Sequence, residues 1–541
     1  MTRIFRLLLS TLSGILLSLA WLGFPGWVSF FAFIPLLFLD NYFVGNKAEF
    51  RSVTYWWHAL WAFFIWNLIT TWWIAYATVV GAALAILANA FLMSFFWWLG
   101  HVARRNFRSD LGYIAMIVFW ISFEYFHFHW DIEWPWLTLG NSFANNIKLI
   151  QWYEFTGFLG GTLWVLIMNV LFFRLITLFL AKVPLRFFIY PATGTLVFLI
   201  FPIVISYVIY TSYEETENPR NIVVVQPNIN PYSERYDRTA ENEKLEKFIR
   251  LAETKTDDST DFVIGPETVF ERYPDWNEDL LEYNNQFLRL SLWMKKYKNA
   301  ELIFGVSSSK VYPDKESAPE TARERNNEVY DVFNSAVFIG RDGEPQIYHK
   351  SILVPGVEKM PFMKYLKFMS DIVIDLGGSS GSLGRQDEPS VFVAHDGTKT
   401  APVICYESVF GEYLAEYVRK GAQLIFIITN DGWWRNTPGY KQHMSFARLR
   451  AIETRRSIAR SANTGISCFI DQRGEVYQAT EWWKEDAIKS NINVNNEITF
   501  YVKYGDYIAR ISLFVAGLLV LFLISKSLAK KQKKSASIPF A

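Results

Sequence analysis

Residues 402–408 read Pro-Val-Ile-Cys-Tyr-Glu-Ser, a short apolar strand that ends in a cysteine and leads into a helical pattern. Strands of this kind alternate along the chain with helical stretches, and three Gly-containing dipeptides indicate hairpin turns. This alternation predicts an α/β sandwich with a mixed sheet. The other predicted strands begin at 221 or span 261–265, 302–306, 335–339, 346–349 and 424–428; the helices span about 239–256, 277–297, 408–420 and 440–459; the turns are Asp342-Gly343, Asp396-Gly397 and Arg473-Gly474.

Three residues of different chemistry stand at the ends of these strands. Glu267 follows the strand 261–265, Lys350 follows the strand 346–349, and Cys405 ends the strand that begins at Pro402. Functional groups of open α/β sheets gather at the carboxyl ends of strands. We therefore expect the three side chains to converge on one rim.

Each of these residues suits one part of an acyl transfer. A cysteine thiolate is a nucleophile, and the helix expected after Cys405 would present its positive N-terminal end to that thiolate. Glu267 can take the thiol proton as a general base. The ammonium of Lys350 and the backbone N–H of Tyr406 can stabilise a tetrahedral oxyanion.

The histidines and the second cysteine leave alternatives. A Cys-His pair that joins Cys405 to His349 or His443 is the chemical rival of the Glu-Lys-Cys set. Cys468 lies in Gly-Ile-Ser-Cys-Phe-Ile, which predicts a buried strand where the thiol is a small apolar side chain. We expect no disulfide between the two cysteines.

The composition predicts a membrane protein. Of the 541 residues, 51% are hydrophobic and 19% are charged, which is too apolar for a typical soluble protein. The formal net charge of +1 gives no global field that would favour nucleic acid as a partner. A spanning helix needs about 20 mostly apolar residues. Eight such spans are predicted, at roughly 4–22, 26–43, 55–77, 79–101, 112–129, 157–180, 187–211 and 508–526.

Basic residues between the spans indicate the orientation. They gather in five alternate segments that should be cytoplasmic, whereas the other loops are nearly free of Lys and Arg. This predicts a seven-helix membrane domain at 1–212, a globular domain outside the cytoplasm at 213–505, and a C-terminal helix with a basic cytoplasmic tail at 506–541. The segments contain Arg3 and Arg6; Lys47 and Arg51; Arg104, Arg105 and Arg108; Lys182 and Arg186; and Lys526, Lys530, Lys531, Lys533 and Lys534.

Two further segments have two interpretations each. The apolar and then Gly-rich segment 359–384 predicts either a lid that dips into the membrane interface or an amphipathic helix packed on the domain. A run of arginines near 450 predicts a solvated or salt-bridged helix face, with contact to phospholipid headgroups as the alternative. These arginines are Arg448, Arg450, Arg455, Arg456 and Arg460.

Four segments resemble the signature blocks of the nitrilase superfamily. They are Ile-Gly-Pro-Glu-Thr at 264–268, Tyr-His-Lys-Ser-Ile-Leu-Val-Pro-Gly-Val-Glu at 348–358, Ile-Cys-Tyr-Glu-Ser at 404–408 and Thr-Asn-Asp-Gly-Trp-Trp at 429–434. Helices before and after such a domain occur in one branch, the apolipoprotein N-acyltransferases, which the chain resembles over nearly its whole length. Trp-Pro-Trp-Leu-Thr-Leu-Gly at 134–140 and Val-Gln-Pro-Asn-Ile at 225–229 also look like that family.

The resemblance implies an αββα nitrilase-like sandwich and a role for each matching residue. Cys405 would be the acylated nucleophile, Glu267 the base and Lys350 the oxyanion partner. Glu358, in a Pro-Gly-Val-Glu block where the family usually has Pro-Phe-Gly-Glu, would hold or polarise Lys350.

Three more residues would support the site. Tyr406 and Glu407 would shape the pocket. Tyr236 falls where the family commonly has a Trp on a mobile loop. The alternative for Glu358 and Glu407 is that they are ordinary surface carboxylates.

The implied reaction is the N-acylation of lipoproteins. A phospholipid, in the family typically phosphatidylethanolamine, would donate an acyl chain to Cys405 as a thioester. The α-amine of an N-terminal diacylglyceryl-cysteine would then accept the chain. No metal or other cofactor is needed, because the thioester stores the activation. The expected location is the inner membrane of a bacterium, with the catalytic domain in the periplasm.

Two other functions remain open. A membrane-tethered amidase or nitrilase would share the three residues but would not need seven preceding spans. A transporter or receptor usually places ionisable residues inside its spans, where this chain has few apart from Glu124 and Arg174. A long-chain acyl adduct on Cys405 would distinguish the acyltransferase from both.

Overall fold

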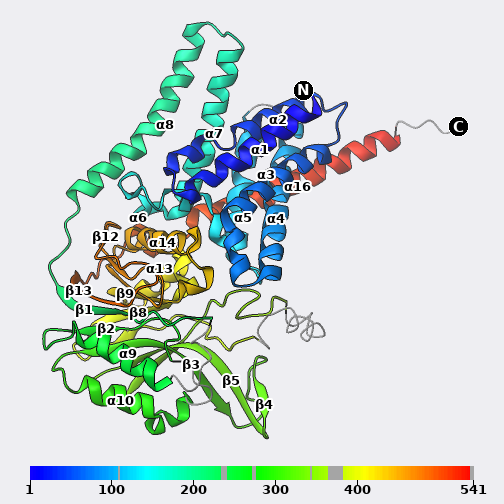
Figure 1. The fold of residues 1–541 in the computed structure, drawn as a ribbon. Helices are drawn as coiled ribbons and strands as arrows, with labels where there is room; N and C mark the ends of the chain where they lie inside the picture. The colour runs from blue at the N-terminus through cyan, green and yellow to red at the C-terminus, as the bar shows by residue number, and fades with distance from the viewer. Residues whose placement is uncertain (108–109, 233–240, 271–275, 342–343, 363–381, 537–541) are drawn as a thin grey trace.

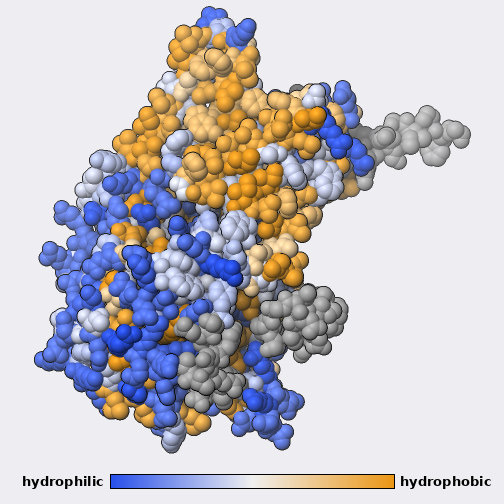
Figure 2. All heavy atoms as spheres, in the orientation of Figure 1, coloured by the Kyte–Doolittle hydropathy of each residue, from blue (hydrophilic) through white to orange (hydrophobic). Residues whose placement is uncertain are grey.

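The computed structural model describes residues 1–541 except 108–109, 233–240, 271–275, 342–343, 363–381 and 537–541. A bundle of helices forms one end of the molecule and an α/β part forms the other, and the last helix returns into the bundle (Figure 1). Figure 2 shows hydrophobic residues over the bundle and mostly hydrophilic residues over the α/β part.

Apolar helices account for every predicted span. Among the described residues, seven segments are long and apolar enough to cross a membrane, and α5 is a shorter apolar helix. A lipid environment demands this form, because a helix satisfies its backbone polar groups internally. The helices are α1 (Arg3–Leu19), α2 (Ile34–Gly45), α3 (Ser52–Thr71), α4 (Val79–Asn106), α5 (Leu111–His127), α7 (Phe158–Leu180), α8 (Leu185–Ser212) and α16 (Tyr507–Ala536).

The predicted α/β sandwich is present as two facing sheets. The first has the order β13-β1-β2-β3-β5-β4, with β6 also paired to β5; the second has the order β12-β11-β10-β9-β8-β7. The first sheet contains β1 (Pro219–Gln226), β2 (Phe262–Ile264), β3 (Glu301–Tyr312), β4 (Arg323–Arg325), β5 (Glu328–Ile339), β6 (Pro345–His349) and β13 (Asp486–Asn493). The second contains β7 (Phe392–Val393), β8 (Lys399–Ile404), β9 (Leu424–Thr429), β10 (Ile458–Ala462), β11 (Cys468–Ile470) and β12 (Val476–Tyr477).

Side-chain alternation along the strands builds the layers. Ile222 and Val224 of β1 pack in the same apolar core as Val403 of β8, between the two sheets. Val223 and Val225 face the other way, against α9 (Glu241–Glu253) and α10 (Asn285–Met294). On the far side, α13 (Gly411–Arg419) and α14 (Pro438–Thr454) lie between the second sheet and the bundle, which gives the order αββα (Figure 1).

Several predicted boundaries are wrong in an informative way. The helix predicted to run to 459 ends at Thr454, because Arg455 adopts a left-handed conformation (φ 49°) and β10 begins at Ile458. No α-helix starts directly after Cys405: residues Cys405–Val409 form a short 3₁₀ helix, η9, and α13 begins at Gly411. The thiol therefore lacks the α-helix terminus expected beside it.

The predicted turns and the second cysteine can be located. Gly397 (φ 83°) and Gly474 (φ 86°) occupy the turns between β7 and β8 and between β11 and β12, as predicted. Asp342-Gly343 lies outside the described residues. Cys468 is buried in β11 and both cysteines are free, as expected.

Four of the five arginines near 450 are fully buried, so the predicted face is salt-bridged and not solvated. The side chain of Arg450 binds Glu453, and Arg455 binds Glu154 of the short helix α6 (Tyr153–Thr156). Glu453 Oε1 also accepts the N–H of Phe158, the first residue of α7, at 2.8 Å. These arginines thus join the α/β part to the bundle. Arg450, Arg455, Arg456 and Arg460 are at most 1% exposed, and the Arg448 side chain is 15% exposed.

Candidate active site

The cysteine sits on a strained elbow after β8. Cys405 has φ 49°, a left-handed conformation that is unfavourable for a residue with a side chain. Its carbonyl oxygen accepts a 2.7 Å hydrogen bond from Ser408 Oγ and lies 3.2 Å from His443 Nε2. Two side chains therefore hold the elbow in place.

A buried lysine lies between two carboxylates beside this elbow. Lys350 Nζ is 3.1 Å from Glu267 Oε1 and 2.8 Å from Glu358 Oε1. Glu267 comes from the loop after β2, Lys350 follows β6, and Glu358 lies in the next loop. The structure brings together the residues expected at the strand ends, and Glu358 is no surface carboxylate because it binds the lysine directly.

The amide of Asn334 completes this cluster and was missed in the sequence. Its Nδ2 donates to Glu267 Oε1 and to Glu358 Oε1, both at 2.8 Å, and the backbone carbonyl of Asn334 accepts the N–H of Lys350 at 2.8 Å. The signal in the sequence was a single asparagine directly before the apolar strand predicted at 335–339. The N–H of Asn430 gives the other Glu267 oxygen a partner at 3.0 Å.

The charges of the cluster set its protonation. Burial by itself would lower the pKa of Lys350, but Glu267 and Glu358 together raise it above its ordinary value. The ammonium therefore keeps its charge. Burial raises the pKa of the Cys405 thiol well above its ordinary value, with a further increase from Glu267 and an opposing decrease from Lys350. The resting group is a neutral thiol that needs a base.

The histidine alternative has a different geometry. His443 Nδ1 lies 2.9 Å from Asp431 Oδ1, and Arg460 Nη2 donates to Asp431 Oδ2 at 2.6 Å. His443 thus contacts the backbone of Cys405, and no hydrogen bond joins it to the thiol within the described part of the chain. His349 Nε2 lies 2.8 Å from Glu278 and its ring stacks on Phe333.

A metal ion would fit this corner poorly. Donor atoms of Cys405, Asp431 and His443 lie within 4.8 Å of one another, which is close enough by distance alone. Both oxygens of Asp431 already bind partners, and one partner is the cationic Arg460. Arg460 and His443 hold the pKa of Asp431 below its ordinary value despite burial.

Glu407 ties the cysteine elbow to the lysine loop. Its Oε2 accepts the N–H of Ile404 at 2.8 Å, and its Oε1 accepts the N–H of Ser351 at 2.7 Å and the hydroxyl of Tyr348 at 2.5 Å. Burial raises the pKa of Glu407 to about 7. Because it is fully buried and spans both loops, Glu407 is no surface carboxylate.

The bundle supplies an aromatic wall to the site. The Tyr406 hydroxyl donates to the carbonyl of Glu133 at 2.8 Å, and the Trp134 ring stacks on the Tyr406 ring at 6.2 Å. Trp73, just after the C-terminal end of α3, contacts Trp136 at 5.1 Å and Trp434 at 4.8 Å. Trp73 was expected only in an interfacial aromatic belt and Trp434 only as part of the block 429–434, and their contact across the two parts was not predicted.

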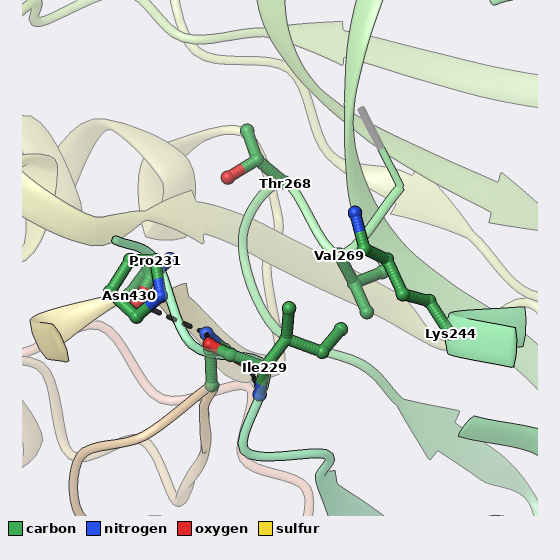
Figure 3. A pocket seen from close by; sticks show the side chains of 7 residues that line it. Ile229, Pro231, Lys244, Thr268, Val269 and Asn430 are labelled. Atoms are coloured by element: carbon green, nitrogen blue, oxygen red, sulfur yellow. Dashed lines mark hydrogen bonds between the residues drawn. The ribbon is translucent and has the colours of Figure 1, made fainter. Parts of the chain in front are cut away.

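Two hollows flank the cluster. Figure 3 shows the smaller one, where Ile229, Thr268 and Asn430 meet. Tyr236 lies outside the described residues, and the described part of its loop reaches this hollow at Pro231. A larger cavity of about 460 Å³ lies between the Ser351-Ile352 segment and the C-terminal end of α5.

The predicted lid is described only at its two ends, because residues 363–381 lie outside the described ones. Lys359 forms an ion pair with Glu133, and the N–H of Phe362 donates to Asp131 at 2.7 Å. The N–H of Met360 donates to Ser382 Oγ at 3.0 Å. The first end thus contacts the loop after α5, the second end contacts the first, and the lid stays a prediction.

Comparisons with known proteins cover both parts of the chain. The family model for carbon-nitrogen hydrolases matches residues 221–498, and the model for the apolipoprotein N-acyltransferase N-terminal domain matches residues 13–171. The apolipoprotein N-acyltransferase of Chlorobaculum tepidum is 30% identical over 533 residues, 95% of each chain. Those of Geobacter metallireducens and Thermotoga maritima are each 26% identical, over 93% and 94% of this chain and 92% of their own.

Proposed function

The chain belongs to the apolipoprotein N-acyltransferase family, and from this premise we propose that it moves an acyl chain from a phospholipid to the N-terminal diacylglyceryl-cysteine of a lipoprotein, through a thioester on Cys405. The observation that carries the mechanism is Lys350, buried between Glu267 and Glu358 beside the strained Cys405. The Trp-lined wall from the bundle supports a lipid as substrate.

In the first half-reaction, the thiol of Cys405 loses its proton to Glu267 as the sulfur attacks the ester carbonyl carbon. The carbonyl electron pair moves onto the oxygen, where the Lys350 ammonium and the N–H of Tyr406 stabilise it. The carbon–oxygen bond then breaks and Glu267 returns the proton to the leaving oxygen. Lysophospholipid leaves, and the acyl chain stays on sulfur as a thioester.

The second half-reaction runs through the same groups. The free amine of the diacylglyceryl-cysteine attacks the thioester carbonyl, and Glu267 takes a proton from the attacking nitrogen. The carbon–sulfur bond breaks as the amide forms, and the proton passes to Cys405. Glu358 and Asn334 keep the side chains of Lys350 and Glu267 in position for both steps. The thioester supplies the activation, so no cofactor is required.

The chain is a bacterial membrane protein, and we place its catalytic part in the periplasm. The domains would be 1–212, 213–505 and 506–541. Contacts between basic segments support this orientation: Arg105 Nη2 donates to the Lys47 carbonyl at 2.9 Å, and Lys526 Nζ donates to the Asn106 carbonyl at 2.5 Å. These segments thus share one end of the bundle. Arg174 joins Asp110 at that end, while Trp73 and Glu133 meet the α/β part at the other end.

The testing experiment follows a labelled acyl chain. Purified protein is given labelled phosphatidylethanolamine, acyl-Cys405 is measured by mass spectrometry, and a diacylated lipopeptide is then added. Wild type should label and then discharge onto the peptide amine. Cys405→Ala should do neither, and Cys468→Ala, which alters a buried thiol in β11, should match wild type. Release of free fatty acid without peptide acylation would indicate a hydrolase instead.

A further inference from the structure

Arg435 is an exposed arginine that has no role in the two half-reactions described above. It follows η10 (Asp431–Trp434) and has φ 50°, a strained conformation for an arginine. Its side chain is exposed, and no carboxylate of the described residues lies within ion-pair distance of it. Backbone strain is retained where the surrounding structure imposes it, and the strained backbone of Arg435 directs outward a cation that pairs with no carboxylate of the described ranges.

Two tyrosine rings hold this guanidinium. Its central carbon lies 4.6 Å from the Tyr76 ring and 5.5 Å from the Tyr232 ring. The Tyr232 hydroxyl is itself fixed, because it donates to the Trp433 carbonyl at 2.6 Å. Stacking on rings uses the face of a guanidinium, one N–H group of Arg435 meets the Tyr232 hydroxyl, and its other N–H groups are available to an anion.

The contact of Arg435 with Tyr76 indicates its position along the membrane normal. That residue ends the apolar segment Ser52–Tyr76, on the side of the bundle that meets the α/β part. A helix that spans the hydrocarbon core ends at the level of the lipid headgroups. Arg435 therefore lies where the phosphates of the adjacent leaflet are found.

Arg435 is also connected to the nucleophile. The neighbouring Trp434 packs on Trp73 at 4.8 Å and on His443 at 5.6 Å. His443 Nε2 in turn lies 3.2 Å from the Cys405 carbonyl oxygen. A lipid whose phosphate meets Arg435 could thus extend along the Trp434 wall toward Cys405.

We propose that Arg435 binds the phosphodiester of the glycerophospholipid acyl donor and so selects the lipid for the first half-reaction. This rests on the function proposed above. Arginine is always charged and its fork of donors matches phosphate oxygens. The acceptor carries a diacylglyceryl group and no phosphate. Arg435 therefore acts on one half-reaction only, which is a property that a structural role would not show.

The test compares Arg435→Gln and Arg435→Lys with Arg186→Gln as matched control. Arg186 is also exposed and lies 4.8 Å from the Phe187 ring, but at the turn between α7 and α8, far from the α/β part (Figure 1). Acyl-Cys405 formation is measured from phosphatidylethanolamine in mixed micelles and from a p-nitrophenyl acyl ester, which lacks phosphate. Discharge of the ester-loaded enzyme onto a diacylated lipopeptide is measured separately.

For Arg435→Gln we expect at least about tenfold lower kcat/KM with phosphatidylethanolamine, mainly through KM, since a hydrogen bond to a charged group is lost. Its reaction with the p-nitrophenyl ester and its discharge should match wild type. Arg435→Lys should recover part of the loss, and Arg186→Gln should match wild type throughout. An unchanged phospholipid reaction, or an equal loss with both donors, would overturn the inference. If wild type forms no acyl-Cys405 from phospholipid, the proposed function itself fails.

Discussion

His443 Nε2 lies 3.2 Å from the carbonyl oxygen of Cys405, and its other nitrogen lies 2.9 Å from Asp431. The histidine therefore braces the backbone of the nucleophile, whereas a Cys-His mechanism would need it on the sulfur. For His443→Gln we expect acyl-Cys405 formation to slow by about tenfold, the value of one or two hydrogen bonds. The pH dependence should keep its shape. Loss as large as that of Glu267→Gln, with a changed pH profile, would make His443 the base.

The thiol pKa provides a prediction with a definite sign. Glu267 raises the pKa of Cys405 and Lys350 lowers it. Glu267→Gln should therefore lower that pKa, so that more thiolate forms at a given pH and iodoacetamide alkylates Cys405 faster. Lys350→Met should shift alkylation to higher pH. Both variants should lose acyl transfer from phospholipid by about 100-fold or more, Lys350→Met through the lost oxyanion charge and Glu267→Gln through the lost general base.

The second cysteine is the internal control for this measurement. Burial raises the pKa of Cys468 to about 11, so it should resist alkylation in every variant at neutral pH. The alkylation rate of each cysteine is measured by mass spectrometry from about pH 6 to about pH 10, a range that includes the ordinary pKa of a thiol. If Glu267→Gln slowed alkylation and transfer together, the charge relation between the two residues would be wrong.

A neutral side chain at position 334 is predicted to be necessary for Glu267 to act as a base. Asn334→Asp would add a third carboxylate beside Glu267 and Glu358, which share a single ammonium. Like charges repel, so protonation would be favoured and the base would be lost at neutral pH. We expect acyl-Cys405 formation to fall by about 100-fold or more. Asn334→Ser, which adds no charge, should lose less, and equal loss in both would indicate a packing role.

The contact between Glu453 and the first residue of α7 should be important for stability. Glu453→Ala leaves Arg450 buried without its partner and removes the acceptor of the Phe158 N–H. Breaking a buried pair typically costs about 3–5 kcal/mol. We expect a corresponding loss in unfolding free energy, measured by denaturation in detergent.

A matched pair provides the control for this measurement. Glu416 and Arg419 have the same i,i+3 spacing on α13 but are partly exposed. Glu416→Ala should therefore change the unfolding free energy by about 1 kcal/mol or less. The double variant Arg450→Met/Glu453→Leu should recover part of the loss, because no lone charge remains. Equal costs for Glu453→Ala and Glu416→Ala would contradict the role of the buried pair.

Topology is tested by reporter fusions. The five basic segments predict that residues 213–505 lie outside the cytoplasm. A reporter that is active only in the periplasm should work when fused near residue 300 and should be silent after Lys534. The opposite pattern would place Cys405 in the cytoplasm and exclude acylation of lipoproteins on the periplasmic side.

The spans and the main strands could be predicted because both are local patterns. A run of about 20 apolar residues must span or be buried wherever it lies, so the eight apolar segments are found without knowledge of their neighbours. Glu267, Lys350 and Cys405 could be proposed because each follows a strand, and the carboxyl ends of strands collect functional groups. The signature blocks then added roles by resemblance.

Tertiary structure alone decided what depends on contacts between distant segments. Two facing sheets place β2, β6 and β8 around one site, and no local pattern assigns a strand to a sheet. Asn334 reaches the carboxylates only because β5 and β6 pair with Ser335 opposite His349. The arginines near 450 were expected on a solvated or salt-bridged face; the ion pairs are present, but they are buried, with Glu453 beside Arg450 and Glu154 beside Arg455. Burial of a charge requires a partner, and for Arg455 that partner, Glu154 of α6, is known only once the bundle has packed against the α/β part.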